Sequence, residues 1–502
     1  MKKNIVPIFV FFIILVCLTG LCFGSDSCLL SYTFEPEFSG NSMLLQVEVA
    51  FQGNSSGKTR IFLPNNWAGQ EKLYESIVSI ISLTPETGLE ETEKSHVRLL
   101  IHAPDEWVRI KYAVKQQWSG PLDGRRFQKY WPNINKKYFH FIGLVFFVYP
   151  DRFRSGQINF EIRWKNFPSG WSIGNSFGCN QLYQKFTSTL ENFRRSVYVG
   201  GDYRIRRILI ENQPVFVALR GEEWGFTDSI YYKFVNKLVA TERNFWEDHE
   251  FPYFLITLTP FGRGHRNSGG TGLYQSFDVF FYSDAKLNFS LKFLFAHELF
   301  HAWNTRGLGR RLSPEPLIYW FSEGFTDYYA RLLLLRAGLI TLEEYVSDYN
   351  AKLIRYCQSP VKEAPNQKIL ESYWTDEDIG RLPYQRGDVI AHRWNSLIKK
   401  RTEERYSLDA VMMDLFKRAQ KGKQVLSHEL LFEVLKALIG KEVEEDLKRY
   451  IEAGRLIELS GEELGPCFEL NYTTPEKIPQ YSLRKGVTYN AAEKCLSWFG
   501  IK

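Results

Sequence analysis

Apolar and polar side chains alternate residue by residue in the first part of the chain. The alternation is clearest at residues 45–49, 96–101, 107–114 and 158–164. Gly, Pro, Asn and Asp, which favour turns, separate these runs. A period of two is typical of β-strands with one buried face. We therefore predict that residues 25–200 form a β-sandwich-like domain.

The hydrophobic period changes after this region. Between residues 229 and 250, apolar positions recur at the spacing of an amphipathic helix. A pair of strands is expected around Phe254 and Phe280, and helical spacing then dominates. The sequence thus predicts an α+β protein whose second domain, residues 201–455, is mainly helical. Residues 456–502 contain Pro and show no clear period, so we expect an irregular C-terminal tail.

Three residues mark expected helix starts within the second domain. Thr341 and Glu344 have the spacing of a capping box, directly after Gly338, which is suited to ending the preceding helix. Ser407 and Ser427 are suited to N-cap two later helices.

The N-terminus has the three parts of an export signal. Lys2 and Lys3 form a short basic start, residues 5–18 are apolar, and residues 22–24 end the segment with a small residue. We expect residues 1–24 to be a cleaved signal peptide, with the mature protein periplasmic or extracellular. The apolar run is almost long enough to span a bilayer, so an uncleaved membrane anchor is the alternative.

Length and composition indicate an ordinary globular protein. With 502 residues, the chain exceeds what one hydrophobic core usually organises. Hydrophobic residues make up 44% and charged residues 24%, which excludes a disordered or collagen-like chain. The formal net charge of +6 is too small and too dispersed to indicate a nucleic-acid partner.

Five cysteines remain after the expected signal peptide: Cys28, Cys179, Cys357, Cys467 and Cys495. Their spacing does not match a metal site. Cys467 and Cys495 bracket the C-terminal tail and could form a disulfide in an oxidising compartment. Buried free thiols are an equally open alternative.

Residues 295–304, with the sequence FAHELFHAWN, carry the main candidate chemistry. Residues four apart lie on one face of a helix, so His297 and His301 can present imidazole nitrogens to one metal ion. Glu298 then stands beside the ion, where it can hold a water. Zinc suits neutral imidazole ligands.

A second segment begins in the same way but lacks one ligand. His428 and Glu429 repeat the opening of the motif, and Phe432 stands where the second histidine would be. We interpret this segment as a capped amphipathic helix without a metal.

A third protein ligand is needed, because a catalytic zinc usually has three together with an open position for water. Residues 320–329, WFSEGFTDYY, place Glu323 among aromatic residues without a charge partner. A carboxylate there is costly unless it binds something, and a dication is the best candidate. Asp327, four residues on, could fix the tautomer of a ligand histidine. The alternative is two solvated acids on a surface helix.

These motifs resemble the glycyl aminopeptidase family of gluzincin metallopeptidases. The likeness also covers residues 303–304, 306–311, 336–339, 384–387 and 407–409. It implies a thermolysin-like catalytic domain after an N-terminal β domain. It further implies one Zn²⁺ ion held by His297, His301 and Glu323, with Glu298 as general base. Members often carry a C-terminal PDZ domain, which we do not expect here.

Tyr384 is similar to the tyrosine that aminopeptidase-type gluzincins supply to the reaction. The resemblance implies that its phenol donates a hydrogen bond to the developing oxyanion, from the start of a helix after Pro383. An ordinary packing tyrosine is the alternative. His392 and His265 are further candidate oxyanion donors, although a lone histidine is more often structural.

Residues 264–274, GHRNSGGTGLY, depart from the family pattern. Glycines suit a strand that approaches a bound peptide closely, so Gly269, Gly270 and Thr271 are predicted to bind substrate. The family has Gly-Gly-Leu-Glu-His in this region, and this chain has no Glu there. Recognition of a free N-terminal amine therefore lacks its expected carboxylate.

The sequence predicts a zinc metallopeptidase that acts on peptides or proteins. Glu298 deprotonates a water, which attacks the peptide carbonyl, and Tyr384 helps to carry the oxyanion. A non-catalytic zinc-containing peptide-binding module is the alternative. Cleavage at free N-termini or within chains stays open, as does the oligomeric state, and a membrane partner is expected only if the N-terminal signal is retained.

Overall fold

The computed structural model describes residues 29–501, apart from residues 41, 121, 250–252, 263, 265–266, 305–306, 312–313, 423–424 and 490–492. The predicted signal peptide at residues 1–24, Cys28 and His265 lie outside the described residues. None of the described helices is both long enough and apolar enough to cross a bilayer.

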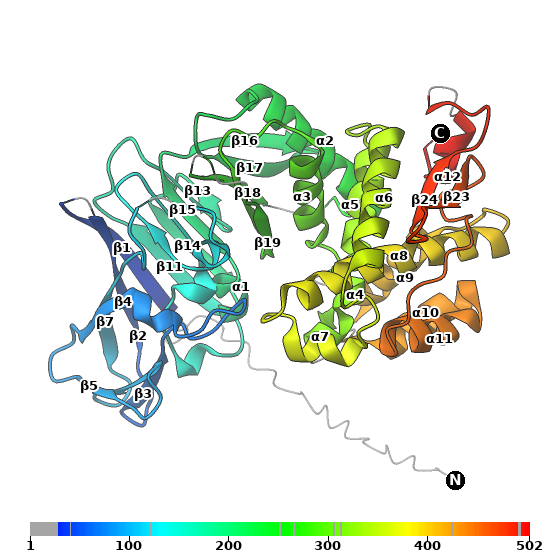
Figure 1. Cartoon of the computed structure of the whole chain (residues 1–502). Coiled ribbons are helices and arrows are strands. Elements are labelled where there is room, and N and C mark those ends of the chain that lie inside the picture. The colour runs from blue at the N-terminus through cyan, green and yellow to red at the C-terminus, as the bar shows by residue number, and fades with distance from the viewer. Residues whose placement is uncertain are drawn as a thin grey trace, which may run out of the picture.

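The N-terminal region consists of packed β-sheets (Figure 1). A six-stranded sheet has the order β14-β11-β1-β2-β7-β4. Its strands are β1 (Leu29–Ser39), β2 (Ser42–Gln52), β4 (Ile77–Ser82), β7 (Trp107–Val114), β11 (Ile158–Trp164) and β14 (Tyr183–Ser188). Burial alternates along β1 and β2, as the period of two predicts.

Two further sheets complete this region. One has the order β13-β12-β15-β9-β8, with β8 (Asn133–Ile134), β9 (Tyr138–Ile142), β12 (Ser172–Asn175), β13 (Gly178–Cys179) and β15 (Val197–Gly201). The other has the order β10-β3-β6-β5, with β3 (Lys58–Phe62), β5 (Gly88–Glu91), β6 (Val97–Ile101) and β10 (Tyr149–Pro150). Tyr32 and Phe34 of β1 share one hydrophobic cluster with Phe139 and Phe141 of β9, so the sheets pack face to face. The short helix α1 (Leu190–Arg194) precedes β15.

A mixed sheet begins the second region. Its order is β16-β17-β18-β20-β19, with β16 (Arg204–Ile210), β17 (Gln213–Leu219), β18 (Leu255–Phe261), β19 (Gly269–Leu273) and β20 (Ser276–Tyr282). β18 and β20 lie where a strand pair was expected. β16 and β17 were not anticipated. They form a hairpin whose turn residues, Glu211 and Asn212, both have positive φ, and such turns match the twist of the strands they join.

Helices cover this sheet and extend beyond it, in one large hydrophobic core. They are α2 (Asp228–Trp246), α3 (Phe289–Phe300), α4 (Tyr319–Ser322), α5 (Gly324–Arg336), α6 (Leu342–Gln358), α7 (Asn366–Ser372), α8 (Glu377–Arg401), α9 (Leu408–Lys421), α10 (His428–Ile439) and α11 (Glu442–Asp446). The short strands β21 (Arg310–Arg311) and β22 (Val425–Leu426) pair among them. The capping box of Thr341 and Glu344 is confirmed, as are the N-caps at Ser407 and Ser427.

Two glycines allow α8 to cross α4 and α5 closely. This crossing supports the candidate metal centre described below. A Cβ on Gly387 of α8 would lie 1.7 Å from the carbonyl oxygen of Trp320, and one on Gly324 would lie 2.3 Å from the Cα of Gly387. Any side chain at these positions would push α8 away from α4 and α5.

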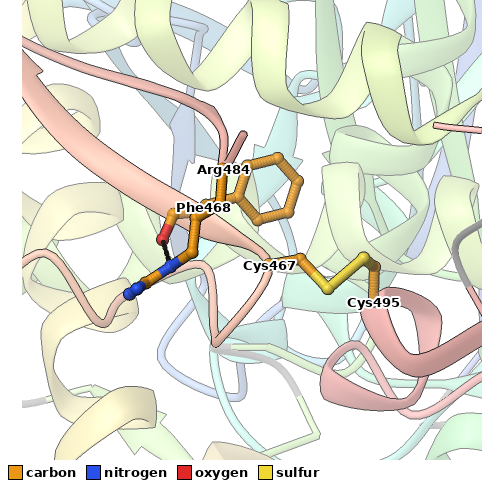
Figure 2. Close-up of a disulfide and its surroundings, with 4 residues drawn as sticks. All are labelled: Cys467, Phe468, Arg484 and Cys495. Carbon is orange, nitrogen blue, oxygen red and sulfur yellow. Dashed lines mark hydrogen bonds between the residues drawn. A yellow bond between two sulfur atoms is a disulfide. The ribbon is translucent and has the colours of Figure 1, made fainter. Parts of the chain in front are cut away.

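The C-terminal residues are more ordered than the sequence indicated. β23 (Phe468–Tyr472) and β24 (Pro479–Leu483) form a hairpin, and α12 (Glu493–Trp498) follows. Cys467 and Cys495 form a disulfide that ties the hairpin to α12 (Figure 2). The hairpin packs on α6, where Asn350 exchanges two hydrogen bonds with the backbone of Tyr481. Local patterns missed this order because it depends on a crosslink and on a distant helix.

The predicted α+β fold class is confirmed: a β-rich N-terminal region precedes a mainly helical one. The division into domains at residues 25–200, 201–455 and 456–502 stays a prediction, which limited proteolysis with mass spectrometry of the fragments would test.

Candidate metal centre

Helix α3 fixes the first two candidate ligands. It begins at Phe289 because the side chain of Asn288 accepts a hydrogen bond from the backbone N–H of Leu291, at 3.2 Å. Phe295 and Phe300 are fully buried and anchor the helix against its neighbours. His297 in the last turn and His301 at the C-cap point away from this packed face, toward the candidate metal centre.

The two histidines and Glu323 converge on one point. The Nε2 atoms of His297 and His301 are 3.0 Å apart. Oε2 of Glu323 lies 3.4 Å from the first and 3.3 Å from the second. Ligands about 2.0–2.2 Å from a tetrahedral zinc ion lie about 3.3–3.5 Å from one another. The donor set and its spacing therefore fit one zinc ion, without rearrangement of the helices.

Glu323 reaches this point from the junction between α4 and α5. Its backbone N–H donates to the carbonyl of Tyr319 at 2.8 Å, so the chain stays helical through the junction. Trp320 and Phe325 on either side are buried, which holds the carboxylate in place. Burial opposes its ionisation, yet the adjacent His301 and His297 hold the pKa of Glu323 well below its usual range.

Asp327 orients His297 from behind. Its Oδ1 accepts a hydrogen bond from Nδ1 of His297 at 2.8 Å, which leaves Nε2 facing the centre. Lys352 of α6 donates to the other oxygen of Asp327. Burial lowers the pKa of His297, but its hydrogen bonds with Asp327 and Glu323 raise that pKa overall, to about 10. The raised pKa means that, without a metal, Nε2 of His297 carries a proton. A dication bound at Nε2 would replace that proton.

Sequence reasoning missed the charged groups behind Asp327. Lys352 also lies 3.6 Å from Asp388 of α8, and Arg331 of α5 makes two hydrogen bonds to that same carboxylate, at 3.1 and 2.7 Å. Arg331 and Asp388 are fully buried. The sequence did contain one sign of a buried charge network. Lys352 falls on the apolar face of α6, next to Leu353, where a lysine needs a charged partner.

Glu298 lies between the candidate zinc ligands and strand β19. Its side chain is nearly buried, and a Cβ on Gly270 would lie 2.4 Å from its Cγ and 2.6 Å from its Oε1. A Cβ on Gly272 would lie 2.9 Å from the Cβ of His301. The glycines therefore let the strand run directly against α3, where the two elements lie side by side in Figure 1.

Strand β19, predicted to bind substrate, lies at the edge of its sheet. Gly269, Gly270 and Thr271 all lie in this strand, and among the described strands β19 pairs only with β20. An edge strand is the kind of element along which an extended chain can add.

Tyr384 faces the same centre from α8. Its ring centroid lies 5.9 Å from that of His297, and its hydroxyl lies 3.1 Å from the hydroxyl of Tyr373. Burial, and after it the charge of Glu323, raises the pKa of Tyr384 well above its usual value, so the phenol stays a neutral donor. The expected helix start after Pro383 is wrong: α8 begins at Glu377 and carries Pro383 inside it.

His392 and His428 have hydrogen-bond partners away from the metal centre. His392 uses one ring nitrogen on the backbone carbonyl of Asp388 and the other on the hydroxyl of Tyr345, which leaves none for an oxyanion. His428 lies 3.0 Å from the carbonyl of Leu317 and serves α10 packing. Within the described part of the chain, a single group of side chains could hold a metal: His297, His301 and Glu323.

Comparison with known proteins finds a family model that matches part of the chain and several structures of similar fold. Residues 290–407 match the model of a family described as M61 glycyl aminopeptidase. A search of curated proteins found no match.

Several solved structures are similar. A protein of the aminopeptidase N family from Idiomarina loihiensis has a TM-score of 0.73 at 16% identity, over 89% of this chain and 80% of that one. An M1 zinc metallopeptidase from Deinococcus radiodurans has a TM-score of 0.52 at 14% identity, over 86% of this chain and 95% of that one. A mutant of the latter, bound to a Tyr-Ser-Ala substrate, has a TM-score of 0.51 at 14% identity, over 86% and 96%. At these identities the likeness establishes a common fold.

Proposed function

We propose that this chain hydrolyses peptide bonds with one zinc ion bound by His297, His301 and Glu323. The match of residues 290–407 to the M61 glycyl aminopeptidase model supports the proposal and agrees with the resemblance seen in the sequence. The observation that carries the proposal is the convergence of three ligand atoms, 3.0–3.4 Å apart, beside the carboxylate of Glu298.

The chain's own groups would divide the reaction between them. Zinc, when bound, polarises the substrate carbonyl and makes a water easier to deprotonate. Glu298 takes the proton from that water and later gives it to the leaving amine. Tyr384 donates its phenolic hydrogen bond to the oxyanion. Asp327 keeps the Nε2 lone pair of His297 directed at the centre.

Strand β19, at the edge of its sheet, would hold the substrate in an extended form. Its residues supply backbone groups and no carboxylate, because the sequence from Gly269 to Leu273 is GGTGL. We therefore propose cleavage that does not depend on a free N-terminal amine, including cleavage within chains.

We also propose that the protein is exported. The basis is the signal-like sequence of residues 1–24, and the disulfide between Cys467 and Cys495 supports it, because such bonds persist in oxidising compartments. N-terminal sequencing of protein from the extracytoplasmic fraction tests this, and full-length protein recovered from the cytoplasm would contradict it.

The main experiment offers a mixed peptide library to the purified protein, with and without a chelator, and identifies products by mass spectrometry. We expect cleavage that the chelator abolishes and added zinc restores. Zinc content near one ion per chain together with no cleavage of any peptide would instead identify a non-catalytic peptide-binding module. Cleavage that survives full removal of the metal would contradict the zinc mechanism.

A further inference from the structure

A cavity of about 290 Å³ opens beside the metal centre. Tyr384 and Tyr373 line it on the side of α8, and Asn267 and Ser268 line it just before β19. Lys129 closes it from the N-terminal region. Because Tyr384 faces both this cavity and His297, a peptide placed at the centre would extend into it.

Lys129 reaches the cavity from a 3₁₀ helix at Arg126–Tyr130. Its Nζ would lie 2.0 Å from a Cβ placed on Gly269, so the ammonium group sits directly against the glycine strand. It also lies 4.7 Å from the centroid of the Tyr130 ring. Among the described residues, no carboxylate lies within 4.0 Å of it. Within the part of the chain that the structure describes, the cavity therefore contains a half-buried cation that makes no direct ion pair.

The other charges near the cavity do not neutralise Lys129. Arg381 and Glu377 pair with each other at its exposed rim. Asp278 of β20 lies opposite Thr271, on the face of the sheet that meets Lys129, but does not come within 4.0 Å of the ammonium group. Burial and then the charge of Glu298 raise the pKa of Asp278 to about 8, although the charge of Lys129 partly lowers it, so Asp278 carries little charge at neutral pH.

We propose that Lys129 binds a carboxylate of the peptide substrate and so determines which peptides enter the cleft. A half-buried ammonium gains a charge-assisted hydrogen bond from a carboxylate and repels a substrate ammonium. The strand that lacks an acid for an N-terminal amine thus faces a cation suited to the opposite charge. The carboxylate comes from an acidic side chain or from a free C-terminus. This inference rests on the proposed peptide substrate.

The test measures binding separately from cleavage. Zinc-loaded Glu298→Gln protein is titrated calorimetrically with peptides that are acetylated and amidated and carry Glu or Gln at successive positions. A third series has Gln and a free C-terminal acid. We expect one carboxylate series to bind about tenfold or more tightly than its neutral match. The peptide series and the residue position at which the affinity increases identify the source of the carboxylate.

Variants assign the effect to Lys129. Lys129→Gln should reduce the preference to within about twofold, and Lys129→Glu should favour a Lys-containing peptide instead. Lys58→Ala removes an exposed cation on β3 and should leave the preference intact. Equal binding of acidic and neutral peptides would overturn the inference, as would a preference that persists in both Lys129 variants.

Parallel cleavage assays of the wild-type protein separate this inference from the proposed function. Cleavage without carboxylate preference contradicts the role of Lys129 and leaves the peptidase intact. Carboxylate-dependent binding without any cleavage supports Lys129 and contradicts the peptidase.

Discussion

One wall of the cleft, formed by α3, α5 and α8, carries buried charged side chains, whereas the opposite wall, β19, offers mainly backbone. On the helical wall, Asp327 has two partners, His297 and Lys352. On the strand wall, Gly270 and Gly272 have no side chain at all, and among the described strands β19 pairs only with β20.

The difference assigns a separate role to each wall, metal chemistry to the helices and peptide placement to the strand. Chemistry at a metal needs side chains held in fixed positions, and a buried charge stays fixed only when it is paired. Holding an extended peptide needs only backbone groups and room for close approach. Substitutions on the helical wall should therefore affect turnover and zinc, and those on the strand wall should affect placement of the base and of the substrate.

The largest effect is expected from Glu298→Gln, which tests whether the helical wall supplies the base. An amide cannot take a proton, so kcat should fall by about 10³-fold or more, while zinc content stays normal. Kinetics on a fluorogenic peptide measure kcat, and elemental analysis measures the zinc content. Glu429→Gln, in the similar opening of α10, is the control and should change neither. Substantial activity of Glu298→Gln would reject the general-base role.

Glu323→Ala tests the third ligand of the helical wall. Two imidazoles alone hold zinc poorly, so zinc affinity should fall by about 100-fold or more, and activity with it. Competition with a chelating dye measures the affinity. Glu371→Ala on α7 removes an exposed carboxylate and should leave zinc bound. Normal zinc content in Glu323→Ala would show that the third ligand lies elsewhere.

Asp327→Asn tests the support behind the ligands. The amide can still accept a hydrogen bond from His297, but it loses the charge that stabilises the liganded imidazole and pairs with Lys352. We expect a loss of about 10- to 100-fold in zinc affinity or activity. Asp348→Asn, which weakens a partner of Arg331 farther from the centre, is the matched control. Equal effects of the two variants on zinc would mean that Asp327 acts only through general stability.

Gly270→Ala links the two walls. The new methyl group would lie 2.4 Å from Cγ of Glu298, so the base must move while the ligands remain. We expect kcat to fall about tenfold with normal zinc. Gly170→Ala in the N-terminal region is the control, because a Cβ there would meet no atom within 4 Å. Equal kcat values for the two variants would mean that close contact with Glu298 is unimportant.

Sequence reasoning selected side chains that the fold brings together where the proposed chemistry depends on local spacing. His297 and His301 are four residues apart, and helix geometry alone places them on one face. Glu323 was found because an unpaired acid among aromatic residues is costly. His428 shows the limit of an opening motif: with Phe432 at the fifth position, it serves only as a packing and hydrogen-bonding residue.

Features formed by distant segments could not be predicted. Lys352 and Asp388 lie on different helices from the metal centre, and no spacing connects them to Asp327. Pro383 was expected near a helix start, yet α8 continues through it because buried neighbours on both sides hold the helix. Lys129 comes from the N-terminal region, more than a hundred residues before β19 in the sequence. Its place in the cleft follows only from tertiary packing.

The smallest effect is expected from blocking the N-terminus of the substrate, and this tests the strand wall alone. A site that selects a free amine needs a fixed negative charge beside the scissile bond, because an ammonium buried without a partner is costly. β19 supplies no acid, and Lys129 opposes a positive charge there. The same peptide should therefore be cleaved at rates within about threefold when free and when acetylated. A tens-fold preference for the free amine would show that another acid has taken this role. Asp278 would be the first candidate, and Asp278→Asn would then have to abolish the preference.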